Sequence, residues 1–109
     1  MTKVRLSRTF EKEAKKLIKK HRSLAGEISE LISSLEQTPN LGTPIGKDCF
    51  KIRLAIKSKG KGKSGGARVI TCLVAVQETV VLLSIYDKAE QADISDEQLR
   101  NLLLDLNIR

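Results

Sequence analysis

The sequence has little of what metal sites, disulfide frameworks and base-stacking surfaces require. Its 109 residues include one histidine, two cysteines and no tryptophan, and aromatic residues make up 3% of the chain. Two cysteines do not make a zinc motif, and without a secretory signal Cys49 and Cys72 are expected to be reduced packing residues. Three aromatic side chains, Phe10, Phe50 and Tyr86, are too few for a sheet that stacks nucleotide bases. We therefore expect no metal site and no small-molecule cofactor.

Long apolar segments are also missing. No run approaches the roughly 18 uninterrupted apolar residues of a membrane span. The N-terminus, MTKVRLSRTF, lacks the apolar part of a secretory signal. We therefore expect a cytoplasmic protein with no membrane partner. A chain of this length with 40% hydrophobic residues suits one compact domain, residues 1–109, and is too short for two.

Negative charge is absent from the middle of the chain. Residues 51–68 contain no acid, and their bases are Lys51, Arg53, Lys57, Lys59, Lys61, Lys63 and Arg68. Like charges at this density repel one another unless a polyanion neutralises them, so we expect this block to contact RNA or another phosphate-bearing partner. Residues 1–22 are also basic, which a solvated helix surface explains. The tripeptide Gly62-Lys63-Ser64 is not a nucleotide loop, because no glycine stands five positions before it and a strand pattern follows it.

The hydrophobic pattern predicts the element order β-α-α-β-β-β-α. The expected elements are a short strand at residues 4–6, helices within 7–21 and 23–38, strands at 49–58, 67–76 and 79–86, and a helix that begins after Ser95. Ser7 or Thr9 is expected to cap the first helix, and Ser95 forms a capping box with Gln98. We expect an α+β fold in which a curved antiparallel sheet packs on a helical hairpin and an extra helix follows at the C-terminus.

Basic side chains are the groups available for catalysis. Lys51 and Arg53 alternate with apolar residues and should lie on the sheet face away from the helices, as site residues or as a merely exposed strand face. Arg68 stands where the basic loop enters an apolar strand, and a buried arginine needs an anionic partner. Tyr86 is either a strand-end residue with a solvated hydroxyl or a substrate contact, and solvation or the charge of a helix end explains His21. This set suits attack of an RNA 2′-hydroxyl on the adjacent phosphate, because guanidinium groups can hold the developing charge and a lysine can exchange a proton.

Three segments resemble the RelE/ParE superfamily of bacterial toxins, and especially its HigB-like members. They are CFKIRLA, then GGARVI after the glycine-rich basic insert, and LLSIYDKAEQADIS before the last helix. The similarity covers most of the chain from Pro39 onward, whereas the first forty residues match only through their helical hairpin. The resemblance implies the toxin of a type II toxin-antitoxin pair, a metal-independent mRNA interferase that cleaves messenger RNA on the ribosome and so inhibits translation. It also implies a cognate antitoxin as partner.

The resemblance also implies roles for particular residues. Lys51 and Arg53 match a basic pair used for proton transfer and phosphate contact, and Arg68 matches an arginine that stabilises the scissile phosphate. Lys88 falls near a second basic position. The tyrosine that some RelE enzymes use is Ile94 here, and Tyr86 is the candidate to replace it. The RNA- and ribosome-binding lysines of the loop would be Lys57, Lys59, Lys61 and Lys63.

Two other functions remain open at this stage. A ParE-like gyrase inhibitor would share the fold without needing the pair of Lys51 and Arg53. A non-enzymatic RNA- or ribosome-binding module would show salt-sensitive binding without cleavage.

Overall fold

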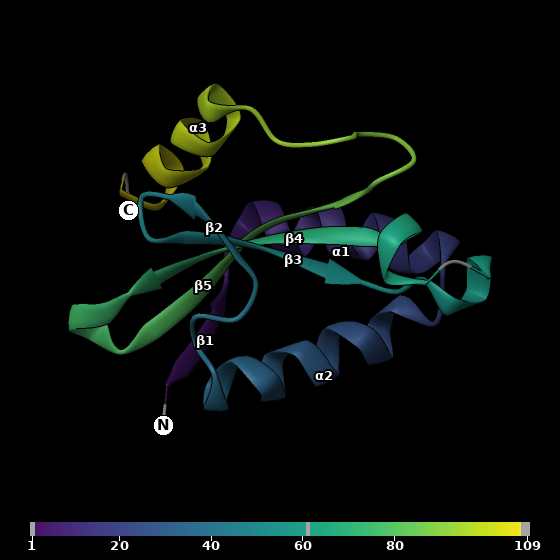
Figure 1. Ribbon diagram of the computed structural model, residues 1–109, viewed down its shortest axis with the longest axis horizontal. Coiled ribbons are helices and arrows are strands. Elements are labelled where there is room, and N and C mark those ends of the chain that lie inside the picture. Colours follow the sequence, from purple (N-terminus) through teal and green to yellow (C-terminus); the bar gives the residue numbers. More distant parts are fainter. Residues whose placement is uncertain (1, 61, 108–109) are drawn as a thin grey trace.

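The computed structural model describes residues 2–60 and 62–107, which form three helices and five strands (Figure 1). The elements are β1 (Lys3–Leu6), α1 (Arg8–Lys20), α2 (Leu24–Gln37), β2 (Thr43–Gly46), β3 (Cys49–Leu54), β4 (Ala67–Val74), β5 (Thr79–Asp87) and α3 (Asp96–Asn107). The α+β class and the predicted elements are confirmed, with one addition. Strand β2 was not predicted, because it is short and contains Pro44; a tight turn at Lys47 and Asp48, both with positive φ, folds it back on β3.

The sheet is mixed, which corrects the expectation of a fully antiparallel sheet. Its strand order is β1-β5-β4-β3-β2, and β1 pairs with β5 in parallel whereas the other neighbours are antiparallel. The two helices between β1 and the remaining strands bring the chain back so that β1 lies beside the last strand, and this pairing is not visible in local sequence.

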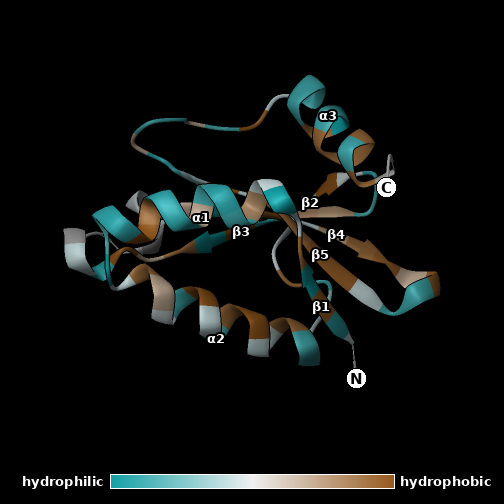
Figure 2. Ribbon diagram, turned by 180° about the vertical axis from the view of Figure 1, so that it is seen from behind, coloured by the Kyte–Doolittle hydropathy of each residue, from teal (hydrophilic) through white to brown (hydrophobic). Residues whose placement is uncertain are grey.

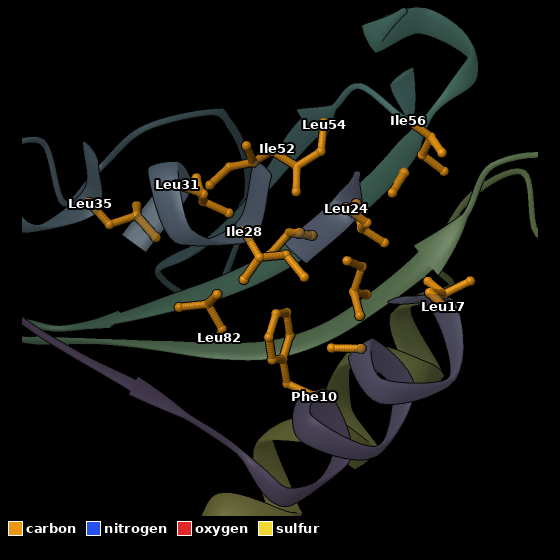
Figure 3. Close-up of a cluster of buried hydrophobic side chains, with 14 of the residues drawn as sticks. Phe10, Leu17, Leu24, Ile28, Leu31, Leu35, Ile52, Leu54, Ile56 and Leu82 are labelled. Carbon is orange, nitrogen blue, oxygen red and sulfur yellow. The ribbon is translucent and has the colours of Figure 1, made fainter. Parts of the chain in front are cut away.

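Helices α1 and α2 cover one face of the sheet and enclose the larger core cluster. Phe10 and Leu17 of α1 point toward Leu24 and Ile28 of α2 and toward the sheet, as Figure 3 shows. Helix α1 begins where predicted, since the Phe10 N–H donates to the hydroxyl of Ser7 at 3.0 Å. The apolar stripes read from the sequence are therefore the residues that form this core.

The opposite face of the sheet is more apolar than predicted. A second cluster of buried side chains lies there beneath α3, and its members are Cys49, Ile70, Cys72, Val81, Leu83, Tyr86 and Leu99. Figure 2 shows the hydrophobic colouring along β4 and β5. The predicted capping box is present: the Ser95 N–H donates to Gln98 Oε1 at 2.8 Å and the Gln98 N–H donates to Ser95 Oγ at 3.1 Å. Helix α3 thus packs on a face that was expected to be basic, and that face is largely apolar beneath it.

Candidate active site

Three candidate residues form one row across the strands. Arg53 of β3 lies directly opposite Arg68 of β4, which lies directly opposite Tyr86 of β5. Residues opposite one another in a sheet project from the same face, so register alone brings these side chains together. Arg53 is exposed, whereas Arg68 and Tyr86 are buried. The row therefore presents one solvent-facing guanidinium beside one that is enclosed.

The Arg68 side chain is held by the backbone where the basic loop ends. Its guanidinium donates from Nη1 to the Ala67 carbonyl at 3.1 Å and from Nη2 to the Ser64 carbonyl at 3.0 Å. Backbone carbonyl oxygens thus satisfy two of its donors, and the expectation that this arginine binds an anion stays a prediction. The guanidinium consequently has a fixed orientation before any ligand is present.

Gly66 allows the loop to approach β3 closely enough to form this arrangement. A Cβ at this position would lie 2.0 Å from the Leu54 carbonyl oxygen, so no other residue fits without movement of the backbone. The Gly66 carbonyl in turn accepts a hydrogen bond from the Lys88 N–H at 3.0 Å. This glycine therefore joins the start of β4, which carries Arg68, to the segment that carries Lys88.

Tyr86 is placed differently from the solvated strand-end residue that the sequence allowed. Its side chain is 7% exposed, and its hydroxyl has no hydrogen-bond partner among residues 2–60 and 62–107. Burial raises the pKa of Tyr86, the carboxylate of Asp93 raises it further, and Arg68 opposes the change. The hydroxyl thus stays protonated at neutral pH and is a buried donor that no described residue uses.

Lys51 contacts a carboxylate that sequence reasoning missed, and the charge of Lys88 also acts on it. The ammonium of Lys51 lies 3.0 Å from Asp93 Oδ1, and the same oxygen accepts the Ile94 N–H at 2.8 Å. These two hydrogen bonds lower the pKa of Asp93, with smaller contributions from desolvation, which opposes them, and from the charges of Lys51 and Lys88. Asp93 belongs to the segment between β5 and α3, which passes over the sheet (Figure 1). The sequence gave no sign of this contact, because Asp93 resembles the other acids of a solvated segment.

The basic loop is attached to the helical hairpin, on the other side of the sheet. The Lys57 ammonium lies 3.2 Å from Glu27 Oε2, and the Ser58 N–H donates to the Ser23 hydroxyl at 2.9 Å. Lys57 is therefore directed toward α2 rather than toward the row of Arg53, Arg68 and Tyr86. Of the other predicted loop lysines, Lys61 and the side chains of Lys59 and Lys63 lie outside the described residues.

His21 stands at the end of α1, as one expectation had it, but it is less solvated than the other expectation required. Its side chain is 15% exposed, and its Nε2 atom lies 3.7 Å from Oδ2 of the buried Asp87. The sequence gave no signal for this pairing, because Asp87 comes from the end of β5. The pair lies on the helix side of the sheet, away from the row that Tyr86 completes.

The site thus combines cations, a neutral hydroxyl and one displaceable carboxylate. Two arginines can face two oxygens of a phosphate, while Lys51 and Tyr86 offer groups that exchange protons. Among the described residues no group of three or more His, Cys, Asp or Glu side chains could hold a metal ion. No helix in the same part of the chain has the length and apolar character needed to span a membrane.

Comparison with known proteins gives a family and a shared fold. A family model described as the RelE toxin of the RelE/RelB toxin-antitoxin system matches residues 2–104. A chain of the intact RelBE toxin-antitoxin complex from E. coli has a TM-score of 0.63 at 18% identity, covering 80% of this chain and 96% of that chain.

Two further toxin structures are also similar. The isolated RelE toxin from E. coli gives a TM-score of 0.62 at 16% identity, covering 95% of this chain and 98% of that one. A metal-bound toxin from Helicobacter pylori gives 0.53 at 15% identity, covering 84% and 99%. At such identities the solved structures show a common fold.

Proposed function

The chain belongs to the RelE toxin family of toxin-antitoxin systems, and from this membership we propose that it is a ribosome-dependent mRNA interferase that needs no metal ion. The observation that carries the proposal is the row of Arg53, Arg68 and Tyr86, with Lys51 and Lys88 beside it. The row concentrates positive charge and a neutral hydroxyl at one end of an otherwise apolar face. Such a set matches the needs of phosphate chemistry and those of few other reactions.

The proposed reaction is attack of a 2′-hydroxyl on the adjacent phosphorus. Arg68 and Arg53 hold the phosphate oxygens on which negative charge develops. Lys51, after its ammonium has given a proton to solvent, takes the proton of the 2′-hydroxyl, and Tyr86 gives its proton to the departing 5′-oxygen. The neutral state of the Tyr86 hydroxyl suits it to the donor role. The products are then a 2′,3′-cyclic phosphate and a free 5′-hydroxyl.

The proposal includes a partner, a compartment and a domain. Because the E. coli complex contains toxin and antitoxin together, we expect a cognate antitoxin for this chain as well. The site offers cations but no exposed aromatic platform, so the ribosome is expected to present the messenger RNA, and the loop lysines to contact RNA there. We place this activity in the cytoplasm and assign it to residues 1–109 as one toxin domain.

The test is cleavage of a defined message in a reconstituted translation system, with and without ribosomes, by toxin that was first treated with EDTA and then freed of the chelator. Primer extension locates the cuts, and direct labelling of the new ends by polynucleotide kinase reports a free 5′-hydroxyl. We expect ribosome-dependent cuts by the EDTA-treated toxin that equal those of the untreated toxin. Arg53→Ala should abolish most of them without unfolding the protein, because Arg53 is exposed.

Lys12→Ala is the matched control, since it removes the same charge from an exposed position on α1, across the sheet from the site. Its cleavage should equal that of the wild type. Intact RNA together with inhibited DNA supercoiling would instead indicate a gyrase inhibitor. Salt-sensitive ribosome binding with no cut strand would indicate a binding module.

A further inference from the structure

Cys49 and Cys72 face each other across two neighbouring strands. Cys49 of β3 is directly opposite Cys72 of β4, and the Leu73 N–H donates to the Asp48 carbonyl at 2.9 Å. That hydrogen bond joins the residues that flank the two cysteines, which identifies them as a non-hydrogen-bonded antiparallel pair. In such pairs the Cα atoms are about 4.5 Å apart, within the range of about 4.4–6.8 Å that disulfides span. The strand register therefore already provides disulfide spacing.

Both thiols are free, and they interact with each other. A hydrogen bond from the Cys49 thiol lowers the pKa of Cys72, while the same bond and burial raise the pKa of Cys49. The Cys49 sulfur also lies 3.4 Å from the Lys47 carbonyl oxygen, a second acceptor for its proton. Cys72 is thus the thiol that reaches the nucleophilic thiolate form more readily.

The pair lies in the apolar cluster on which helix α3 packs. Cys49 is 1% exposed and Cys72 is 8% exposed, and both share a cluster with Leu99 of α3. The remaining contacts of this helix are limited, since Leu102, Leu103 and Leu106 are only partly buried. A terminal helix with a small apolar contact opens locally at low free-energy cost. Such opening would expose Cys72 first.

We propose that Cys49 and Cys72 form a redox-active dithiol, which a low-molecular-weight disulfide such as oxidised glutathione converts to a cross-strand disulfide. The Cys72 thiolate attacks one sulfur of that disulfide, forming a mixed disulfide and releasing one glutathione thiolate. Cys49 loses its proton to water and attacks the Cys72 sulfur, releasing the second glutathione thiolate. Two protein thiols are oxidised, and one small disulfide is reduced to two thiols.

The bond would close a loop that contains the candidate active site. Residues 49–72 include Lys51, Arg53 and Arg68 together with the basic loop. Closing this loop restricts the unfolded chain far more than the folded one, in which the pair is already adjacent. Oxidation should therefore stabilise the protein, with a rise in Tm of roughly 10 °C for a loop of this length. The proposed dithiol does not depend on the function proposed above. It is argued from strand register, from burial and from the interaction between the two thiols.

The experiment exposes the full-length protein, reduced and native, to oxidised glutathione at neutral pH. Samples are quenched with acid, and their intact masses are measured over time. We expect the loss of two hydrogen atoms, a rise in Tm, and reversal of both by dithiothreitol. Cys49→Ser should stop at one glutathione adduct on Cys72, and Cys72→Ser should react more slowly because Cys49 is the more enclosed thiol.

Two variants of α3 test the route of access. Leu99→Ala loosens the helix over the pair and should accelerate disulfide formation several-fold, whereas Leu104→Ala, 57% exposed on the same helix, should leave the rate unchanged. If Leu99→Ala does not fold, disulfide formation in the wild type still tests the proposal. Glutathione adducts without an internal disulfide, or reaction only in concentrated urea, would overturn the proposal.

Discussion

Lys51 and Asp93 stand 42 positions apart in the chain and meet as an ion pair, with Nζ 3.0 Å from Oδ1. The carboxylate occupies the position beside Lys51 where the proposed function requires a substrate phosphate. Because Asp93 is well exposed, the pair is weak and a stronger anion can displace it.

Asp93→Asn should strengthen RNA binding. Removing the carboxylate frees Lys51 from a pair worth about 0.2–1 kcal/mol, so the Kd for a short single-stranded RNA should fall by roughly two- to fivefold at low salt. Fluorescence anisotropy at two salt concentrations measures this change. Asp105→Asn on α3 makes the same change of charge at an exposed position outside the site and serves as control. Equal effects of the two variants would mean that net charge alone is responsible.

Tyr86→Phe should separate function from stability. The hydroxyl has no partner among the described residues, so its removal should leave the free energy of unfolding unchanged or raise it by up to about 1 kcal/mol. If the hydroxyl transfers a proton, cleavage should nevertheless fall by about 10²-fold or more. Urea unfolding and cleavage rates measure the two quantities. A large loss of stability would contradict the environment described here for this hydroxyl.

The titration of Tyr86 can be followed directly, because it is the only tyrosine and the chain has no tryptophan. Its raised pKa should appear in the near-ultraviolet absorbance as ionisation above the ordinary value near 10. The folded state then holds this proton more tightly than the unfolded state, so its contribution to stability is complete below pH 10 and is lost as pH rises through the folded pKa. Asp93→Asn should shift the titration downward. An unshifted curve in both proteins would refute the assigned causes.

Arg68→Ala should destabilise the protein as well as inactivate it. The substitution leaves the Ser64 and Ala67 carbonyl oxygens without their donor, at a cost of about 2–3 kcal/mol in the free energy of unfolding. Arg53→Ala, in the same row but exposed, should change stability by less than about 0.5 kcal/mol. Urea denaturation of the two variants gives the comparison. Similar stabilities would mean that the contacts of Arg68 contribute little to folding.

Gly66→Ala should be among the most damaging small substitutions in the basic loop. Its Cβ would collide with the Leu54 carbonyl, and relief requires movement of β3 against β4, at a cost of about 2–3 kcal/mol. Gly62→Ala is the control, because its Cβ would meet nothing within 4 Å. Thermal unfolding of both variants decides the point, and equal Tm values would show that the loop can shift at little cost.

Local sequence was enough for much of the fold. The caps of Ser7 and Ser95, the apolar stripes of α1 and α2, and the end of α2 before Pro39 involve contacts within a few positions, so the pattern predicts them well. Strand β2 was missed, since it has only four residues, contains Pro44, and depends on a turn in which Lys47 takes a positive φ that lysine rarely adopts. The parallel pairing of β1 with β5 was also missed, because strand order is a long-range property.

The sequence by itself determined the inventory: a block of bases without acids, one tyrosine, two cysteines, and strands whose alternation puts Lys51 and Arg53 on one face. Tertiary structure alone decided which of these groups meet. Register set Arg68 between Arg53 and Tyr86 and placed Cys49 against Cys72, while the segment after β5 brought Asp93 to Lys51. The physical reason is that composition and periodicity depend on near neighbours, whereas pairing across a sheet and burial under α3 depend on how the whole chain packs.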